Sequence, residues 1–326
     1  MYRRISRNRR YPLSAIATDP SGCNVRPKDK SKDSITSLLK KPAALKSPPW
    51  GVWKQQYARM SRLRELCSNL SEKDKLTQRN LRAVKRHFFD NYIYNFRFCF
   101  VPKVASKTLL RQFFYREESI HPSPLGHEEY LKTFVFVREP FLRLLSAYLS
   151  KFTNGRELQL IWEKMFGLDI VERYRENGAH YVDEWKRAKN TKCPTNLFPF
   201  LNVTFREFVN YILESGLNTP LNSFNDHWLP QTEISIPCAL RYQFIGKFEK
   251  LEDDVLFVLE WLGLQNRRPL PVFHESLTEK VFHTEYSQLS TKQILQLKEF
   301  YRMDYILLNY NDTWPNKALR LVTKDV

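Results

Sequence analysis

The chain has 326 residues, a formal net charge of +17 and 42% hydrophobic residues, which is enough apolar material for a large folded domain. A basic chain favours acidic partners such as nucleotides, sulfated glycans, nucleic acid or anionic membranes. No run of about 18 apolar residues indicates a membrane span. The basic residues of Met1–Arg10 are not followed by an apolar segment, so no secretory signal is predicted.

Composition divides the chain near residue 50. Residues 1–50 are rich in Arg, Lys, Ser and Pro and show no periodicity, which predicts a basic disordered tail or linker. Residues 51–326 are expected to form one domain. It begins with two helical patterns, 52–69 and 75–90, of which the second is strongly basic and suits a solvated face or a glycan groove.

The next segment, residues 96–116, predicts a buried strand, a short loop and a helix. Lys103, Ser106, Lys107 and Thr108 gather where the helix would begin. A helix N-terminus presents unpaired N–H groups and a partial positive charge, so these cations and hydroxyls predict a phosphate or sulfate site.

A second strand-to-helix turn follows. The apolar run 133–138 ends in Arg138, and a helix is predicted from Pro140 to Phe152, with the proline in its first turn. Two basic turns of this kind predict one site for a ligand with two anionic groups.

The later segments alternate between helix and strand. Helices are expected near 156–166 and 180–190, after the capping box Thr204–Glu207, from Leu251 to Leu262 with Gly263 as the stop, and from Ser290 or Thr291 to about Leu308. A strand is expected from Leu240 to Gly246. The alternation predicts an α/β fold, a P-loop-like three-layer core with a central parallel sheet flanked by helices, whose ligands bind at the carboxyl ends of the strands.

The five cysteines form no CxxC pair, so no metal site is expected, and at least one cysteine has no partner within the chain. Cys99 alternates with two phenylalanines in a predicted strand and is expected in the core.

Two motifs resemble those of a known family. Val101-Pro-Lys-Val-Ala-Ser-Lys-Thr108 is similar to the 5′-phosphosulfate loop of sulfotransferases. The segment from Phe136 to Phe152 has every fixed position of V-R-x-P-F-x-R-L-x-S-A-Y-x-x-K-F, a pattern of the Golgi carbohydrate sulfotransferases that modify chondroitin, dermatan and related glycans. His227-Trp-Leu-Pro230 and Phe300–Tyr305 also fit, and the resemblance covers roughly residues 90–310.

The resemblance implies 3′-phosphoadenosine 5′-phosphosulfate as sulfuryl donor and a glycan or proteoglycan hydroxyl as acceptor, without metal and without a nucleic-acid partner. It places the phosphosulfate on Lys103, Ser106, Lys107 and Thr108, with Lys103 also acting on the leaving phosphate. Arg138 and Ser146 would bind the 3′-phosphate.

Proton transfer from the acceptor requires a general base. His227 is the first candidate because it lies in the family-like motif, and His121 and His127 are held in reserve.

The chain departs from the family in three respects. Ser106-Lys-Thr-Leu109 stands where the family has Cys-Thr-Asn-Trp, and Ser235 stands where the near neighbour of Cys238 would be. The membrane anchor of the family is absent from the sequence, although the family implies the Golgi. Three glycosylation sequons, at Asn69, Asn202 and Asn311, agree with a lumenal location.

Two other functions stay open at this point. A P-loop nucleotide kinase or hydrolase would need an acidic magnesium ligand at a strand end, and the predicted strand at 133–138 ends in arginine. A nonenzymatic basic module for anionic glycan or nucleic acid would not need two spaced anion loops.

Overall fold

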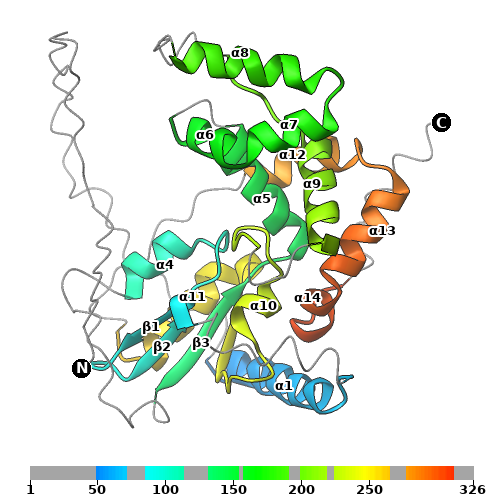
Figure 1. Ribbon diagram of the computed structural model, residues 1–326. Helices are drawn as coiled ribbons and strands as arrows, with labels where there is room; N and C mark the ends of the chain where they lie inside the picture. The colour runs from blue at the N-terminus through cyan, green and yellow to red at the C-terminus, as the bar shows by residue number, and fades with distance from the viewer. Residues whose placement is uncertain are drawn as a thin grey trace, which may run out of the picture. The chain divides into compact units, whose positions relative to one another are not determined.

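A four-stranded sheet lies at the centre of the fold, with its strands in the order β1-β2-β3-β4 (Figure 1). These are β1 (Phe88–Asn91), β2 (Phe96–Cys99), β3 (Lys132–Val137) and β4 (Phe244–Lys247). The strands β2, β3 and β4 run parallel, and β1 pairs antiparallel with β2 at one edge. All of β4 and all but the first residue of β3 are buried, as expected for parallel strands with both faces covered.

The computed structural model describes residues 49–71, 85–113, 131–153, 157–190, 199–218, 224–264 and 277–311. Apart from its last two residues, the segment 1–50 lies outside these ranges, so the proposed tail and domain boundary stay predictions.

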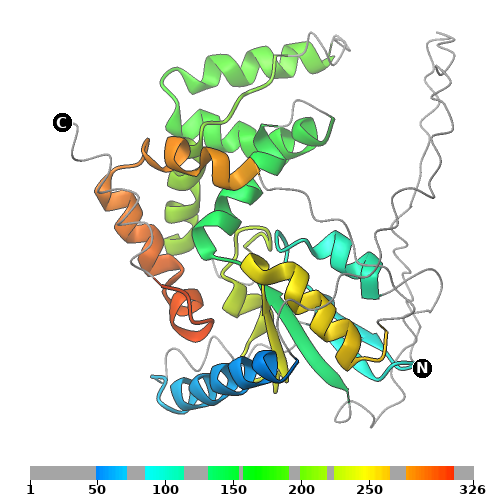
Figure 2. The ribbon, with the colours of Figure 1, turned by 180° about the vertical axis from the view of Figure 1, so that it is seen from behind.

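One face of the sheet is lined by phenylalanine rings: Phe96, Phe98, Phe134, Phe136 and Phe244. The helix α4 (Ser106–Phe113) packs on them through Phe113, 5.0 Å from the Phe134 ring. The helix α11 (Leu251–Trp261) packs through Phe257, 5.2 Å from the Phe244 ring. Figure 2 shows α11 in front of the strands. Ring-on-ring packing of this kind stabilises the sheet beyond simple area burial.

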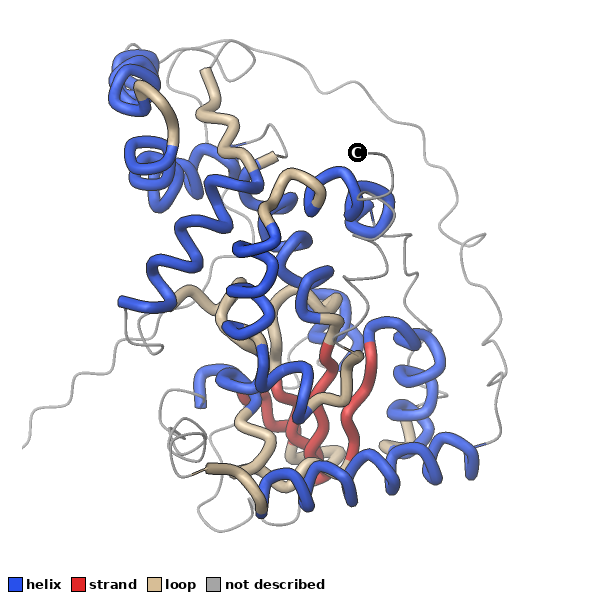
Figure 3. Tube along the Cα trace, turned by 90° about the vertical axis from the view of Figure 1, so that its right-hand side faces the viewer, coloured by secondary structure: helices blue, strands red, loops and turns tan. Residues whose placement is uncertain are grey.

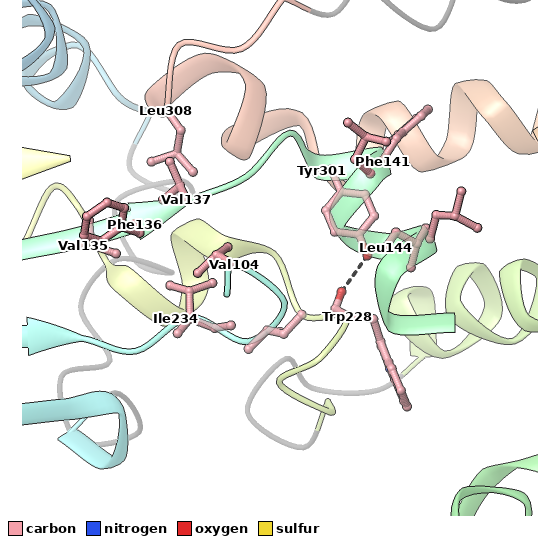
Figure 4. Packing of buried hydrophobic residues seen from close by; sticks show 14 of the residues in the cluster. Val104, Val135, Phe136, Val137, Phe141, Leu144, Trp228, Ile234, Tyr301 and Leu308 are labelled. Atoms are coloured by element: carbon pink, nitrogen blue, oxygen red, sulfur yellow. Dashed lines mark hydrogen bonds between the residues drawn. The ribbon is translucent and has the colours of Figure 1, made fainter. Parts of the chain in front are cut away.

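The opposite face is covered by α10 (Gln231–Ser235) and α14 (Arg302–Leu307). Leu308 lies against Val137 of β3, and the hydroxyl of Tyr301 donates to the carbonyl of Trp228 at 2.6 Å (Figure 4). The Cys99 thiol of β2 contacts the Ile234 carbonyl of α10 at 4.0 Å. Helices therefore lie on both faces of the strands (Figure 3). The predicted α/β class with a three-layer core is confirmed, with an antiparallel edge strand in addition.

The remaining helices extend beyond the carboxyl ends of the strands (Figure 1). They are α5 (Pro140–Phe152), α6 (Glu157–Trp162), a π-helical turn (Glu163–Gly167), α7 (Leu168–Tyr174), α8 (Gly178–Asn190), α9 (Phe205–Asn218), α12 (Leu277–Tyr286) and α13 (Thr291–Phe300). The predicted capping box forms before α9, since Thr204 N–H donates to Glu207 and Glu207 N–H donates to the Thr204 hydroxyl.

Two element predictions were wrong in part. The last residues of the helix predicted over 75–90 belong instead to strand β1, because Phe88 and Phe89 pair with β2. Residues 72–84 lie outside the described ranges, so the first part of this prediction is not tested. The final helix breaks at Tyr301 into α13 and α14, while Ser290 caps it as predicted. Gly263 follows α11 with φ 72°, a conformation that favours glycine.

The first helix, α1 (Pro49–Ser68), packs at the β4 edge of the sheet. Gln56 exchanges two hydrogen bonds with the backbone of Ile245, both 3.2 Å long. A disulfide joins Cys67 to Cys238. Cys99 is free, and it is buried as predicted. Among the helices described, none has the length and apolar character to cross a membrane.

Candidate active site

A pocket of about 440 Å³ opens where the parallel strands end. Its wall comes from the loop after β2, the residue after β3, the turn after β4, helices α4, α5 and α6, and the loop before α10. Every residue predicted for the site lines it: Lys103, Ser106, Lys107, Thr108, Arg138, Ser146 and His227. The structure thus brings together Lys103 and His227, which are 124 positions apart in the sequence. The roles of these residues stay predictions. The reserve candidates His121 and His127 lie outside the described residues.

The loop before α4 is conformationally unusual. Lys103 and Ala105 adopt φ angles of 74° and 59°, in the left-handed region that disfavours residues with a Cβ. Such strain persists where the surrounding structure imposes it and gathers at ligand sites. Here the loop achieves without glycine a turn that brings the Lys103 ammonium to 2.7 Å from the Ser150 hydroxyl oxygen.

The pKa of Lys103 is lowered to about 7. Burial is the main cause, followed by the positive charges of Lys151, Arg138, Lys107 and Arg143. An anion bound in the pocket would raise the pKa of Lys103 again, because its negative charge opposes the effect of the neighbouring cations.

The start of α4 presents three polar side chains of different exposure. Ser106 is buried, and its hydroxyl donates to the Val101 carbonyl across the base of the loop. Lys107 is exposed and Thr108 is half-buried. In this conformation the Ser106 oxygen offers lone pairs only, so its hydroxyl must rotate before it donates to an oxyanion.

Arg138 lies immediately after β3 and joins the two basic turns. Its guanidinium stacks over the Phe248 ring at 4.1 Å and donates from Nη1 to the Lys103 carbonyl at 3.4 Å. Only 2% of the residue is exposed, and burial lowers its pKa. Gln231 fixes its backbone by accepting from the N–H at 2.9 Å and donating to the carbonyl at 2.7 Å.

His227 has a defined tautomer when neutral. Its backbone N–H and its Nδ1 contact the same atom, Oδ1 of Asn225, at 3.0 and 2.9 Å. Because the backbone N–H can only donate, this Asn225 atom must accept, and Nδ1 must donate to it as well. The ring proton therefore sits on Nδ1, and Nε2 retains the lone pair that a general base needs.

The pKa of His227 is lowered to about 3. Burial contributes most, then the charges of Lys151, Lys103 and Arg143, whereas Asp226 acts in the opposite direction. The ring is therefore uncharged at neutral pH, as a proton acceptor must be.

Arg143 is a positioning residue that the sequence did not single out. It is 1% exposed, and its guanidinium donates to three carbonyls: Pro102 at 2.9 Å, Leu229 at 2.7 Å and Asp226 at 2.8 Å. These bonds tie α5 to the loop before α4 and to the segment that carries His227. The sequence did contain a signal for Arg143, because it is the second arginine of the family-like pattern over Phe136–Phe152.

Ser150 and Lys151 were also missed. Both line the pocket from the last turn of α5, where Lys151 holds its ammonium 4.0 Å above the Trp162 ring. Ser150 follows Ser146 by four residues, and this helical spacing places both hydroxyls on one face, a signal that was present in the sequence.

Comparisons with known proteins agree with this geometry. Carbohydrate sulfotransferase 14 of Danio rerio is 29% identical over 255 residues, 70% of this chain and 63% of that protein. Carbohydrate sulfotransferase 11 of Mus musculus is 32% identical over 186 residues, 56% of this chain and 48% of that protein. Carbohydrate sulfotransferase 8 of Homo sapiens is 32% identical over 183 residues, 54% of this chain and 38% of that protein.

The chain thus spans less than two thirds of the length of these relatives, and no solved structure matches it. A family model, described as the sulfotransferase family, matches residues 86–311. Because this match covers well over half of the chain and contains every residue that lines the pocket, the chain belongs to the sulfotransferase family.

Proposed function

We propose that the protein is a carbohydrate O-sulfotransferase that moves a sulfuryl group from 3′-phosphoadenosine 5′-phosphosulfate to a hydroxyl of a glycan. The observation that carries this proposal is the single pocket in which both basic turns meet, with the Arg138 guanidinium donating to the Lys103 carbonyl. The pocket volume lies within the range of about 300–1,000 Å³ typical of small-molecule sites.

The donor would be held at its two anionic ends. The start of α4, with Lys107 and Thr108, suits the 5′-phosphosulfate, and Arg138 with Ser146 suits the 3′-phosphate. Charge-assisted hydrogen bonds to oxyanions are among the strongest in proteins, and helix N-termini add favourable N–H groups. Lys103 would stabilise the charge that develops on the leaving phosphate.

His227 would act as the general base. Its Nε2 lone pair would accept the proton of the acceptor hydroxyl, while the Nδ1–H bond to Asn225 holds the ring in place. An anion bound beside Lys103 and Lys151 would weaken the positive field that now depresses the His227 pKa, so the base would become stronger when the donor is present.

The sequence relatives support a glycan acceptor through their names alone. We propose a Golgi location and N-glycosylation from the family resemblance, supported by the exposure of Asn69, Asn202 and Asn311. A metal-independent reaction and the absence of a nucleic-acid partner stay predictions.

The nucleotide kinase or hydrolase is disfavoured by a specific observation. No carboxylate is found among the described residues that line the pocket. Glu139, which follows Arg138, is engaged at both oxygens, by the Leu142 N–H and the Tyr305 hydroxyl, each at 2.7 Å. The described part of the pocket thus offers a magnesium ion none of the acidic ligands on which such enzymes depend.

Ligand preference tests the proposal. Adenosine 3′,5′-bisphosphate should bind more tightly than ATP, and Arg138→Ala should weaken its binding about 10- to 100-fold, because charged hydrogen bonds of about 1.5–3 kcal/mol are lost. Titration calorimetry measures both. Arg206→Ala, an exposed arginine that bonds the Gln288 carbonyl, is the matched control and should bind normally. A preference for ATP, or equal binding by the Arg138 variant, would contradict the proposal.

Transfer itself is measured with radiolabelled donor and a panel of desulfated glycans. Incorporation into at least one glycan is expected, and the pattern across the panel identifies the acceptor sugar. Tight binding of adenosine 3′,5′-bisphosphate without incorporation into any glycan would support the donor site but contradict the proposal that a glycan is the acceptor.

A further inference from the structure

Lys151 occupies a distinctive place in the pocket. It follows Ser150, whose hydroxyl oxygen accepts from the Lys103 ammonium at 2.7 Å, and both residues line the pocket. The Lys151 ammonium lies 4.0 Å from the centre of the Trp162 ring, in the geometry of a cation–π contact. The side chain is therefore held at the pocket wall rather than extended into solvent.

The same indole also supports His227. The Trp162 and His227 rings are 5.0 Å apart and nearly perpendicular, and Trp162 is itself 8% exposed against Trp228 and Phe166. One rigid ring thus positions both the Lys151 ammonium and the candidate base. Lys151 therefore shares the Trp162 ring with His227, and the residue before it, Ser150, accepts the hydrogen bond from Lys103.

The electrostatics agree with this position. Burial lowers the pKa of Lys151 to about 8, with the charge of Lys107 adding to the effect. After burial, Lys151 is the largest charge that lowers the pKa of both Lys103 and His227. Within the described ranges, no carboxylate forms an ion pair with Lys151. An ammonium beside two other basic groups favours the binding of an anion.

Sulfuryl transfer supplies such an anion at this point. The acceptor oxygen forms a new bond to sulfur while the bond from sulfur to the 5′-phosphate oxygen breaks. The hydroxyl proton goes to Nε2 of His227, and the electron pair of the broken bond goes to the phosphate beside Lys103. The sulfuryl group therefore passes between Lys103 and His227, and its nonbridging oxygens need donors there.

We propose that Lys151 is a catalytic residue that donates hydrogen bonds to the nonbridging oxygens of the sulfuryl group during transfer, an inference that rests on the sulfotransferase function proposed above. Lys103 then stabilises the leaving phosphate, His227 accepts the proton of the attacking hydroxyl, and Lys151 binds the sulfuryl group that is transferred. Trp162 is the residue that positions Lys151.

Lys151→Met separates this role from other roles for the same cation. Adenosine 3′,5′-bisphosphate lacks the sulfuryl group, so its affinity should change less than threefold. The affinity for the complete donor should fall about tenfold, and kcat should fall about 100- to 1,000-fold, as when one donor to a developing charge is removed. Lys151→Arg keeps the positive charge and should retain more of kcat than Lys151→Met.

Two outcomes would overturn the proposal in favour of another contact. An equal loss of affinity for adenosine 3′,5′-bisphosphate and for the complete donor would make Lys151 a phosphate ligand. A rise in the acceptor KM with unchanged kcat, seen only for anionic glycans, would make it an acceptor contact. An unchanged kcat with every acceptor would also overturn it.

Two control variants complete the experiment. Lys107→Met removes another pocket lysine and should weaken both nucleotides equally. Lys164→Met removes an exposed lysine of the π-helical turn and should change neither. If the wild-type protein binds no nucleotide and transfers no sulfate, the proposed function has failed; if it is active and Lys151→Met is equally active, only the role of Lys151 has failed.

Discussion

At the scale of single residues, the site is defined by basic groups whose protons are held weakly. Lys103, Lys151 and His227 all have pKa values below their ordinary ranges, each mainly because of burial and then because of neighbouring cations. Placing these cations close together in a buried pocket costs electrostatic free energy. Anion binding would offset it, so ligand affinity and protonation must be linked.

This linkage predicts a pH dependence. Lys103, with a pKa of about 7, is largely charged below pH 7 and largely neutral above it. Binding of adenosine 3′,5′-bisphosphate favours the charged form, so the affinity should fall as pH rises from 7 to 9, by up to about tenfold per pH unit for each lysine that must regain its proton. The ligand phosphates, with a second pKa of about 6, stay ionised over this range.

Calorimetry in two buffers of different ionisation enthalpy measures the linkage directly. Proton uptake on binding should be larger at pH 8.5 than at pH 7, and Lys103→Met should reduce it. An affinity that is constant or rises between pH 7 and 9 would contradict the expectation.

Sequence patterns located the charged residues but not their supports. Lys103, Arg138 and His227 were found because basic or family-like motifs mark them. Arg143 was missed since an arginine inside a helix gives no sign that its three acceptors come from other segments. Only the folded chain determines which carbonyls a buried guanidinium reaches.

At the scale of elements, the short helix α10 links the site to the C-terminal helices. Asp304 of α14 is fully buried and receives the Gln231 N–H, the Thr232 N–H and the Thr232 hydroxyl, each at 2.8 Å. A carboxylate at the first turn satisfies N–H groups that the helix leaves unpaired. Through Gln231, the same cap holds the backbone of Arg138.

Asp304→Ala should therefore destabilise the fold and impair the site together. Loss of the carboxylate removes the acceptor of three buried hydrogen bonds, and the free energy of unfolding should fall by about 3 kcal/mol or more. Urea denaturation followed by circular dichroism measures the loss. The control is Glu299→Ala, an exposed residue that pairs with Arg302, which should change stability by about 0.5 kcal/mol or less. Equal stability of the two variants would show that the hydrogen bonds of Asp304 to α10 do not stabilise the fold.

Elements with strong local signals were predicted well, and those that depend on partners were not. Pro140 and the apolar spacing after it set the bounds of α5, and Ser290 set the start of α13. The segment Phe88–Asn91 continued a basic helical pattern, yet it forms β1. Its pairing with β2 supplies backbone hydrogen bonds that a local reading of the sequence does not include.

At the scale of the whole described domain, one covalent link joins distant segments. The disulfide Cys67–Cys238 connects α1 to the segment after α10, across a sequence separation of 171 residues. A cross-link over so long a loop restricts the unfolded chain strongly, and such disulfides commonly contribute about 2–5 kcal/mol. The sequence left the partner of Cys238 undetermined.

Reduction should accordingly lower the melting temperature of the wild-type protein. The double variant Cys67→Ser, Cys238→Ser should melt at the lower temperature with or without reductant, as followed by differential scanning calorimetry. Cys99 is buried and free, so Cys99→Ala should leave the difference between oxidised and reduced protein intact. A wild-type melting temperature that is the same with and without reductant would contradict the expected role of the disulfide.

The sequence by itself determined the α/β class, the two basic turns and the family resemblance, because apolar periodicity, helix capping and motif residues are local properties of the chain. The tertiary structure decided that both turns and His227 share one pocket, that Asn225 sets the ring tautomer, and that Cys67 is the partner of Cys238. It also placed Lys151 and His227 on one indole ring. These facts depend on distances between residues far apart in sequence, which only the packing of the sheet and its helices establishes.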